Sequence, residues 1–441
     1  MNLNKEILRL SVPAIVSNIT VPLLGLCDTA ISGHMGSEIY LAAIGIGSTM
    51  LSVIVGLLVF LRMGTTGLTA TAFGAGDEKM VEKVFSRAFL LGLGLGVLLV
   101  ALRDPVMELM LAVIGPDDEV RRYAESYFTV RIWGMPAMFA VMSVSGWFVG
   151  MQSTAAPMAI AIIMNVLNII LSYLLVFHTG VGFTGVAWGT AVSNWIGLVV
   201  ALVWAAWFRR GKPLFGSLRD LFKGGGMSKF FSVNTALFLR SACIMSVSLG
   251  VTSAGARMGA LTMAVNVVMI QFFIFFSYFM DGFAFSAEAL TGRYYGAGSL
   301  ERLHMSVRAL LRWTLGVAVL FSVIYTFGSS FVAALLTDTQ NVREGVADMR
   351  LWLTMLPLLS AWAFIYDGFF VGITKTDRMM LATLVASVVF YIVAFLRISP
   401  SGLIWGVPDN NTLWTAFLSY LTLRGAILAV IWRFQKLNTY L

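Results

Sequence analysis

The sequence contains few charged residues and almost no cysteine or histidine. Of its 441 residues, 12% are Asp, Glu, Lys or Arg, which is about half the share of roughly 25% found in soluble domains. The cysteines, Cys27 and Cys243, both fall in long apolar stretches and give no evidence of a disulfide framework. His34, His178 and His304 have no metal-ligand spacing. These shortages exclude an ordinary soluble domain and give no support for a metal site.

Apolar residues dominate instead. They make up 59% of the chain, and the mean hydropathy is +0.86. Their runs are long and continuous, whereas a membrane β-barrel would show short alternating segments. Backbone polar groups in lipid must be hydrogen bonded within each segment. The composition therefore predicts an all-α polytopic membrane protein.

Twelve stretches reach the length of about 20 residues that a membrane-spanning helix requires. They are residues 7–32, 40–73, 85–101, 123–150, 158–177, 185–208, 230–254, 259–289, 310–336, 346–373, 379–396 and 412–432.

Basic residues are distributed unevenly between the two sides of this predicted topology. Nineteen Lys and Arg residues lie on the side of the two termini and seven on the other side. Because basic loops stay in the cytoplasm, we predict that both termini are cytoplasmic. The same bias accounts for the net charge of +8 without a nucleic-acid partner.

The chain contains an internal repeat with a period of 222 residues. FGAGDEKMVEKVFSRAFLLG at Phe73 matches YGAGSLERLHMSVRALLRW at Tyr295, and WFVGMQSTAAPM at Trp147 matches FFVGITKTDRMM at Phe369. The repeat predicts two six-helix lobes, residues 1–210 and 228–441, joined by a cytoplasmic loop, 211–227. Six spans are an even number, so the lobes share one orientation and enclose a cavity near the membrane midplane, which is typical of transporters.

The first span carries an acid, Asp28. Placing a carboxylate inside a bilayer costs about 2.5–3.5 kcal/mol on insertion scales. Pro22 removes a backbone hydrogen bond and predicts a kink in this helix. Only Arg62 and Arg131 are possible basic partners in the same lobe. We interpret Asp28 as a group that gains and loses a proton, since a carboxyl group away from water is more easily protonated. The alternative is a permanent ion pair.

Further charged residues fall within the spans of the second lobe. Asp281 and Glu288 are seven positions apart and share one helix face, and Asp367 lies in the tenth span. Arg240 lies midway along the seventh span, and Arg424 lies in the twelfth. We expect Arg240 to pair with at least one of the three acids. A fixed salt bridge within the second lobe is the alternative to a role in transport.

Polar residues follow one face of the fifth span and one face of the sixth. They are Asn165, Asn168 and Ser172 on the fifth, and Thr190, Ser193 and Asn194 on the sixth. Such residues commonly join neighbouring membrane helices through hydrogen bonds.

Several segments resemble the multidrug and toxic compound extrusion (MATE) transporters, and most closely the DinF-like branch of that family. The segments are PLLGLCDTAISGHMG, LAAIG, FGAGD, NVLNIILSYLLVF, GVGFTGVAWGT, FMDGFAFSAEALTGRYYGAG and YDGFFVGITKT, in that order along the chain. The resemblance implies a V-shaped fold of twelve helices. It also implies an antiporter that exports organic, often cationic, compounds in exchange for protons or sodium ions.

The resemblance also implies roles for particular residues. The acid of the family's first helix falls on Asp28, the asparagine of its fifth helix on Asn168, and a polar residue of its sixth helix near Thr190. The family often has an aspartate where this chain has Ser172. Sodium binds best to charged oxygen ligands, so this difference favours protons as the coupling ion.

In the NorM-like branch, an acid of the seventh helix joins an acid of the tenth. This chain has Asp367 in the tenth span but Arg240 in the seventh. That difference argues against a sodium site in the second lobe.

We therefore expect a monomeric, proton-coupled exporter of small organic compounds in a prokaryotic plasma membrane. Protonation of Asp28 from outside would change the packing of the first helix and release the substrate. Arg240, Asp281, Glu288 and Asp367 would set the charge of the cavity. No cofactor is expected.

The alternatives are sodium coupling and a lipid or lipid-precursor flippase, which would favour a cationic cavity. An intramembrane enzyme would require a nucleophile with its base, or a metal cluster, and neither pattern is found.

Overall fold

The structure, a computed structural model, describes residues 3–35, 37–216, 226–399 and 402–435. Within these ranges, twelve helices or interrupted helices are long and apolar enough to cross a membrane. This number confirms the prediction from the sequence.

The first lobe contains the first six spans. They are α1 (Leu3–Gly33), α2 with α3 (Glu38–Leu58 and Phe60–Gly74), α4 (Glu78–Ala101), α6 with η1 and α7 (Asp118–Arg131, Ile132–Gly134 and Met135–Gly150), α8 (Ala155–Phe177) and α9 (Gly185–Phe208). Two further elements connect spans, α5 (Arg103–Ile114) and the single turn η2 (Gly182–Thr184).

The second lobe contains the other six. They are α11 (Met227–Arg257), α12 (Ala260–Gly296), α13 (Leu300–Leu336), α15 (Arg350–Gly372), α16 (Thr376–Phe395) and α17 (Asn410–Phe434). A short helix, α14 (Gln340–Asp348), precedes α15. An antiparallel hairpin of β1 (Leu396–Ser399) and β2 (Gly402–Trp405) separates α16 from α17.

Several helices continue beyond the apolar stretches that predict them. Both α12 and α13 have 37 residues, a length of about 55 Å, which exceeds the apolar core of roughly 30 Å in a bilayer. Backbone hydrogen bonding does not stop where the lipid ends. The charged segments after Phe73 and Tyr295 therefore form the first turns of α4 and α13. Neither α5 nor the hairpin was expected, because both are too short to span a membrane.

Backbone geometry repeats at the interval found in the sequence. Gly76 and Gly298, 222 positions apart, have positive φ angles of 71° and 67°. Gln152 and Thr374, also 222 apart, have positive φ angles of 65° and 58°, which non-glycine residues seldom adopt. The two lobes are therefore structural copies of one six-helix unit.

One difference between the copies lies in the second span. In the first lobe this span is interrupted at Val59, between α2 and α3. The equivalent position in the second lobe is Asp281, which lies within the continuous helix α12.

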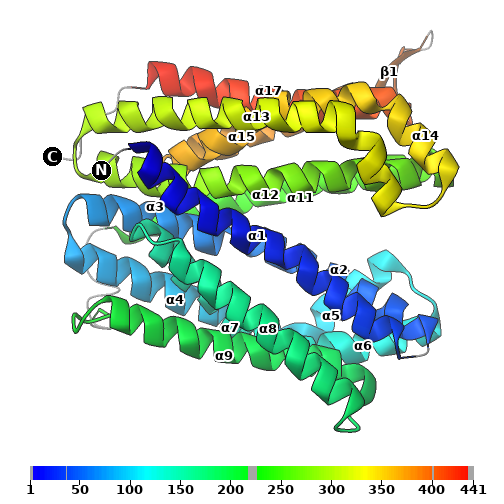
Figure 1. Cartoon of the computed structure of the whole chain (residues 1–441), viewed down its shortest axis with the longest axis horizontal. Coiled ribbons are helices and arrows are strands. Elements are labelled where there is room, and N and C mark those ends of the chain that lie inside the picture. Colours follow the sequence, from blue (N-terminus) through cyan, green and yellow to red (C-terminus); the bar gives the residue numbers. More distant parts are fainter. Residues whose placement is uncertain (1–2, 36, 217–225, 400–401, 436–441) are drawn as a thin grey trace.

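The two lobes form a V. They lie close together at the end where both termini are found and diverge towards the other end (Figure 1). We call these ends the terminal side and the open side. The pairs of helices in contact between the lobes include α1 with α12, α3 with α12, α3 with α11, and α3 with α15.

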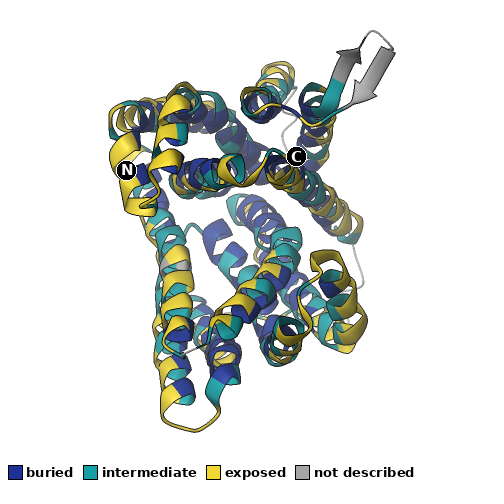
Figure 2. Ribbon diagram, turned by 90° about the vertical axis from the view of Figure 1, so that its right-hand side faces the viewer, coloured by how far each residue is buried: buried dark blue, intermediate teal, exposed yellow. Residues whose placement is uncertain are grey.

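The outward faces of the helices carry large apolar side chains. Phe327 is 84% exposed, Val113 80% and Trp207 72%. Figure 2 shows buried residues gathered where helices face one another and exposed residues along the outer faces. Apolar surface of this extent requires a lipid surrounding rather than water.

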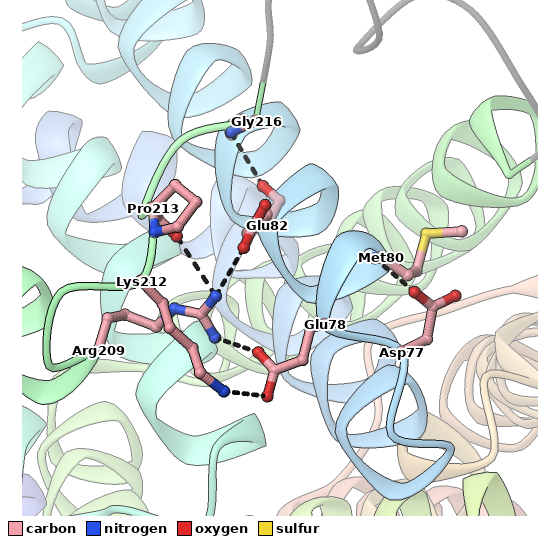
Figure 3. Close-up of polar contacts among 9 residues, drawn as sticks. Asp77, Glu78, Met80, Glu82, Arg209, Lys212, Pro213 and Gly216 are labelled. Atoms are coloured by element: carbon pink, nitrogen blue, oxygen red, sulfur yellow. Dashed lines mark hydrogen bonds and ion pairs between the residues drawn. The ribbon is translucent and has the colours of Figure 1, made fainter.

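The loop between the lobes begins with an anchored segment. Arg209, whose side chain is 3% exposed, forms ion pairs with Glu78 (2.5 Å) and Glu82 (2.7 Å) of α4. Lys212 also contacts Glu78, and the backbone N–H of Gly216 donates to Ser86 (Figure 3). The first residues of the loop are thus attached to the first lobe. Residues 217–225 lie outside the described ranges, so the predicted boundaries 211–227 stay a prediction.

Glycines bring α3 and α12 into direct backbone contact on the terminal side. A Cβ atom on Gly74 would lie 2.0 Å from the carbonyl oxygen of Arg293. A Cβ atom on Gly296 would lie 2.0 Å from the carbonyl oxygen of Thr71. Because Gly74 matches Gly296 and Thr71 matches Arg293 at the interval of 222, the contact is symmetrical. We call it the glycine contact.

We predict that Gly296→Ala weakens the packing of the lobes. The added methyl group would force α3 and α12 apart, and overpacking of this kind typically costs about 1–3 kcal/mol. The midpoint of thermal unfolding of the purified protein in detergent should fall. Gly316→Ala is the matched control, because a Cβ atom there meets nothing within 4 Å. Equal midpoints for the two variants would contradict the prediction.

Candidate functional site

A cavity of about 610 Å³ lies between the two lobes. Its wall is largely apolar and includes Met63, Met138, Phe273, Phe364 and Phe417. Six charged side chains also line it: Arg62, Arg240, Asp281, Glu288, Asp367 and Arg424. Three positive and three negative groups face the same space, so their formal charges balance.

The first charged group in the cavity is a triad within the second lobe. Asp367 of α15 lies between Arg240 of α11 and Arg424 of α17, and both guanidinium groups donate to its Oδ2 atom. Arg424 also donates to the hydroxyl of Tyr420 at 3.3 Å. All three charged residues are buried. The predicted pairing of Arg240 is therefore confirmed, with Asp367 as its partner.

Arg424 is a second partner of Asp367 that the sequence did not assign. In the sequence, the one indication that Arg424 has a partner is that arginine is rare inside an apolar span. The triad carries a net charge of +1. Since it joins α11, α15 and α17, it also holds the second lobe together.

The second charged group connects the lobes. Arg62 of α3 donates to both carboxylate oxygens of Glu288 in α12, at 3.0 and 3.2 Å. Its guanidinium group also lies 3.9 Å from the centre of the Phe285 ring. Glu288 is completely buried. Two parallel hydrogen bonds between charged groups form one of the stronger polar contacts in proteins. Arg62 is therefore occupied by Glu288 and is not the partner of Asp28.

Asp281 is the remaining charged residue of the cavity. Within the described residues, no hydrogen bond or ion pair to its side chain is found. Arg62 is the basic group with the largest electrostatic effect on it. Asp281 therefore presents a carboxylate without a direct partner to the interior of the cavity.

Asp28 lies in the first lobe, outside the lining of this cavity. It is five residues before the end of α1 at Gly33, near the open side. Its Oδ1 atom is buried and has no hydrogen-bond partner among the described residues. Arg131, in the last turn of α6, is the charged group that acts on Asp28 through space. The Nε and Nη1 atoms of Arg131 are also buried without a partner there.

The other predicted coupling residues form a separate polar group between α8 and α9. Asn168 donates to the hydroxyl of Thr190 at 2.6 Å. The hydroxyls of Thr190 and Ser172 both donate to the backbone oxygen of Val186, at 3.1 and 3.5 Å. The Oδ1 atom of Asn168 has no partner among the described residues. No hydrogen bond found in the described part of the chain joins this group to Asp28.

Pro22 lies within α1, together with Pro13, and the helix is continuous from Leu3 to Gly33. The kink expected at Pro22 stays a prediction. The same helix reaches the second lobe, because Ser11 is hydrogen bonded to Ser286 (2.7 Å) and Asn18 to the backbone oxygen of Tyr278 (3.2 Å). Thus α1 connects the surroundings of Asp28 to the interface between the lobes.

A two-lobed fold of twelve spans around a charged cavity defines a membrane transporter. The profile of the MatE family matches residues 13–174 and 236–396, almost three quarters of the chain. The chain therefore belongs to the MatE family, the MATE transporters, which confirms the resemblance seen in the sequence.

Relatives and solved structures agree with this assignment. The chain is 34% identical to DNA damage-inducible protein F of Escherichia coli (strain K12), over 98% of this chain and 92% of that protein. It is 26% identical to a probable multidrug resistance protein NorM of Thermotoga maritima, over 77% of this chain and 74% of that protein. An outward-facing multidrug resistance MATE transporter has the same fold, with a TM-score of 0.82 and 20% identity, covering 98% of this chain and 96% of that one.

We predict that Asp367→Asn destabilises the second lobe. Removing the acid leaves Arg240 and Arg424 buried together without a counter-charge, and breaking a buried ion pair typically costs about 3–5 kcal/mol. The midpoint of thermal unfolding in detergent should fall clearly. Asp338→Asn is the control, because Asp338 is fully exposed in its pair with Arg343. The two variants would have to unfold at the same temperature for this role of Asp367 to be wrong.

Proposed function

We propose that this chain exports organic cations and cationic amphiphiles across a prokaryotic plasma membrane in exchange for protons. The observation that carries this proposal is that no hydrogen bond or ion pair to the side chain of Asp28, an acid in the first span, is found among the described residues. The names of relatives, such as multidrug resistance protein NorM, support export of several compounds.

The coupling step in this proposal is the loss of one electrostatic attraction. Charged Asp28 attracts Arg131, which links α1 to α6. A proton on Asp28 removes that attraction and leaves α1 freer to move relative to α6. Because Ser11 and Asn18 of α1 contact α12, a change in the packing of α1 reaches the interface between the lobes. Protonation at one end of the helix can thus alter the closure of the cavity.

The substrate class follows from the cavity. Glu288 is paired with Arg62, and Asp367 is paired with Arg240 and Arg424, whereas Asp281 has no direct partner among the described residues. An organic cation would place its charge at Asp281 and its apolar body against the methionine and phenylalanine side chains. A flippase for phosphate-bearing lipids would favour free arginines in the cavity, and the described pairs leave Arg62, Arg240 and Arg424 occupied.

Sodium coupling is the second candidate, and one observation favours it. Both Asp28 and Asn168 have a side-chain oxygen that is buried without a partner in the described residues. Oxygen atoms of this kind are ligands for hard cations. The absence of a second carboxylate, at Ser172, weakens this candidate.

For the orientation, we place the terminal side in the cytoplasm, on the basis of the excess of basic residues there. In this orientation the V opens to the exterior, where substrate would leave and protons would enter. We propose that one chain is sufficient, since each lobe supplies one half of the cavity.

The first test is efflux of a fluorescent organic cation from proteoliposomes under an imposed pH gradient or an imposed sodium gradient. We expect a proton gradient to drive efflux by the wild type, and Asp28→Asn to abolish it, because the amide cannot exchange a proton. Asp118→Asn, an exposed site in the first turn of α6, should behave as the wild type. Efflux by Asp28→Asn at the wild-type rate would refute the coupling role, and efflux driven by sodium alone would establish the second candidate.

A separate prediction concerns Asp281. In Asp281→Asn the cation would lose a charged partner, and hydrogen bonds to charged groups contribute about 1.5–3 kcal/mol. The KM for a cationic substrate should therefore rise about tenfold or more. The KM for an uncharged substrate of similar size should stay the same, which controls for damage to the cavity. Equal changes for both substrates would show that Asp281 does not recognise charge.

A further inference from the structure

A second cavity of about 610 Å³ opens on the terminal side of the molecule. Its lining comes from both lobes. The first lobe contributes the start of α1, the segment 151–153 after α7, and Phe208 at the end of α9. The second lobe contributes the end of α12 and the first turns of α13. This cavity is separate from the central one and shares no lining residue with it.

The charges of this cavity are predominantly positive. Arg9, Arg293 and Arg302 line it, and Glu6 is the acid among its lining residues. Glu6 accepts hydrogen bonds from Arg293 (2.8 Å) and from the hydroxyl of Tyr294 (3.1 Å). Neither Arg9 nor Arg302 forms an ion pair within the described residues, and both are exposed. After the Glu6–Arg293 pair is set aside, two positive charges remain available.

The remaining lining is partly apolar. Leu3, Leu10, Met151, Phe208 and Met305 contribute side chains to the same space. A soluble anion would use only the arginines, whereas a lipid would use both parts. The position also fits a lipid, because the cavity is lined by the ends of membrane-spanning helices, at the start of α1, the end of α12 and the first turns of α13. Basic pockets between membrane helices on the cytoplasmic side are known to bind anionic head groups.

We propose that this cavity binds the phosphate group of an anionic membrane lipid, with Arg9 and Arg302 as its ligands. The planar guanidinium group can donate two parallel hydrogen bonds to one phosphate. The apolar side chains would cover the upper part of the acyl chains. The Glu6–Arg293 pair gives this region a fixed wall, because it joins α1 to α12.

The two-lobe lining gives the bound lipid a second effect. Arg9 belongs to α1 and Arg302 to α13, so an opening of the terminal side that separates the start of α1 from α13 would move the two ligands apart. A ligand that binds one conformation better than another shifts the equilibrium towards it. The lipid would therefore hold the terminal side closed. This second effect rests on the proposed opening and closing of the transporter, whereas lipid binding itself does not.

Thermal unfolding of the purified full chain in detergent tests the binding. We expect dioctanoyl phosphatidylglycerol to raise the midpoint by about 2 °C or more, and dioctanoyl phosphatidylcholine to leave it unchanged. The double variant Arg9→Gln, Arg302→Gln should lose this shift. The double variant Arg308→Gln, Arg312→Gln removes the same charge from exposed positions outside the cavity and should keep it.

Inorganic phosphate distinguishes the source of the anion. No shift with phosphate, together with the shift with phosphatidylglycerol, would support a lipid site. Equal shifts with both, lost in the Arg9 and Arg302 variant, would overturn the lipid and leave a site for a soluble phosphate. A shift that survives in this variant, or disappears equally in the Arg308 and Arg312 variant, would overturn the site itself.

The effect on the lobes is tested by labelling. Ser11 is completely buried at the contact of α1 with α12. In a chain with Cys27→Ser and Cys243→Ser, Ser11→Cys should react with a water-soluble maleimide only when the terminal side opens. Phosphatidylglycerol should slow this reaction at least about threefold, and the Arg9 and Arg302 variant should abolish the slowing. An unchanged rate alongside a clear thermal shift would retain the binding site and overturn its effect on closure.

Discussion

The close approach of two backbones on the terminal side is the constraint on which the rest of the structure depends. Only glycine at positions 74 and 296 allows α3 and α12 to come this close. The same two helices carry Arg62 and Glu288, which are hydrogen bonded across the interface. The interface is not limited to this contact, since α1 also packs against α12, and α3 packs against α11 and α15.

The duplicated lobes have come to carry different chemistry at equivalent positions. Asn18 and Arg240 are 222 positions apart and both line the central cavity, as do Ser145 and Asp367. Neutral polar groups in the first lobe thus correspond to an ion pair in the second. Among the described residues, the second lobe holds Asp367 in a triad with Arg240 and Arg424, whereas no hydrogen bond or ion pair to the side chain of Asp28 is found in the first lobe. We therefore place the proton-coupling step of the proposed mechanism in the first lobe.

Much of this architecture could be predicted from the sequence, because span length and the 222-residue repeat are local or periodic signals. The bounds of α9, residues 185–208, were predicted to the residue. The pairing of Arg240 could be narrowed to three acids but not assigned, since the choice depends on how each helix is rotated about its axis. The pairing of Arg62 with Glu288 crosses the lobes, and no local pattern reports such a contact. That Asp281 has no direct partner among the described residues could be seen only after Arg62, Arg240 and Arg424 had been placed. That Asp28 and Asn168 lie apart could likewise be seen only in the structure, because it depends on how α1 and α8 pack.

The interruption at Val59 makes the second spans of the two lobes unequal. The second span of the first lobe is divided into α2 and α3, while its copy, α12, is a single rod of 37 residues. A rod transmits displacement along its whole length, whereas a divided helix can absorb part of it as a change of angle. The second span of the first lobe would then be the more compliant of the two copies. The same span, present twice, thus differs in continuity, and bending of its first copy would be concentrated at Val59.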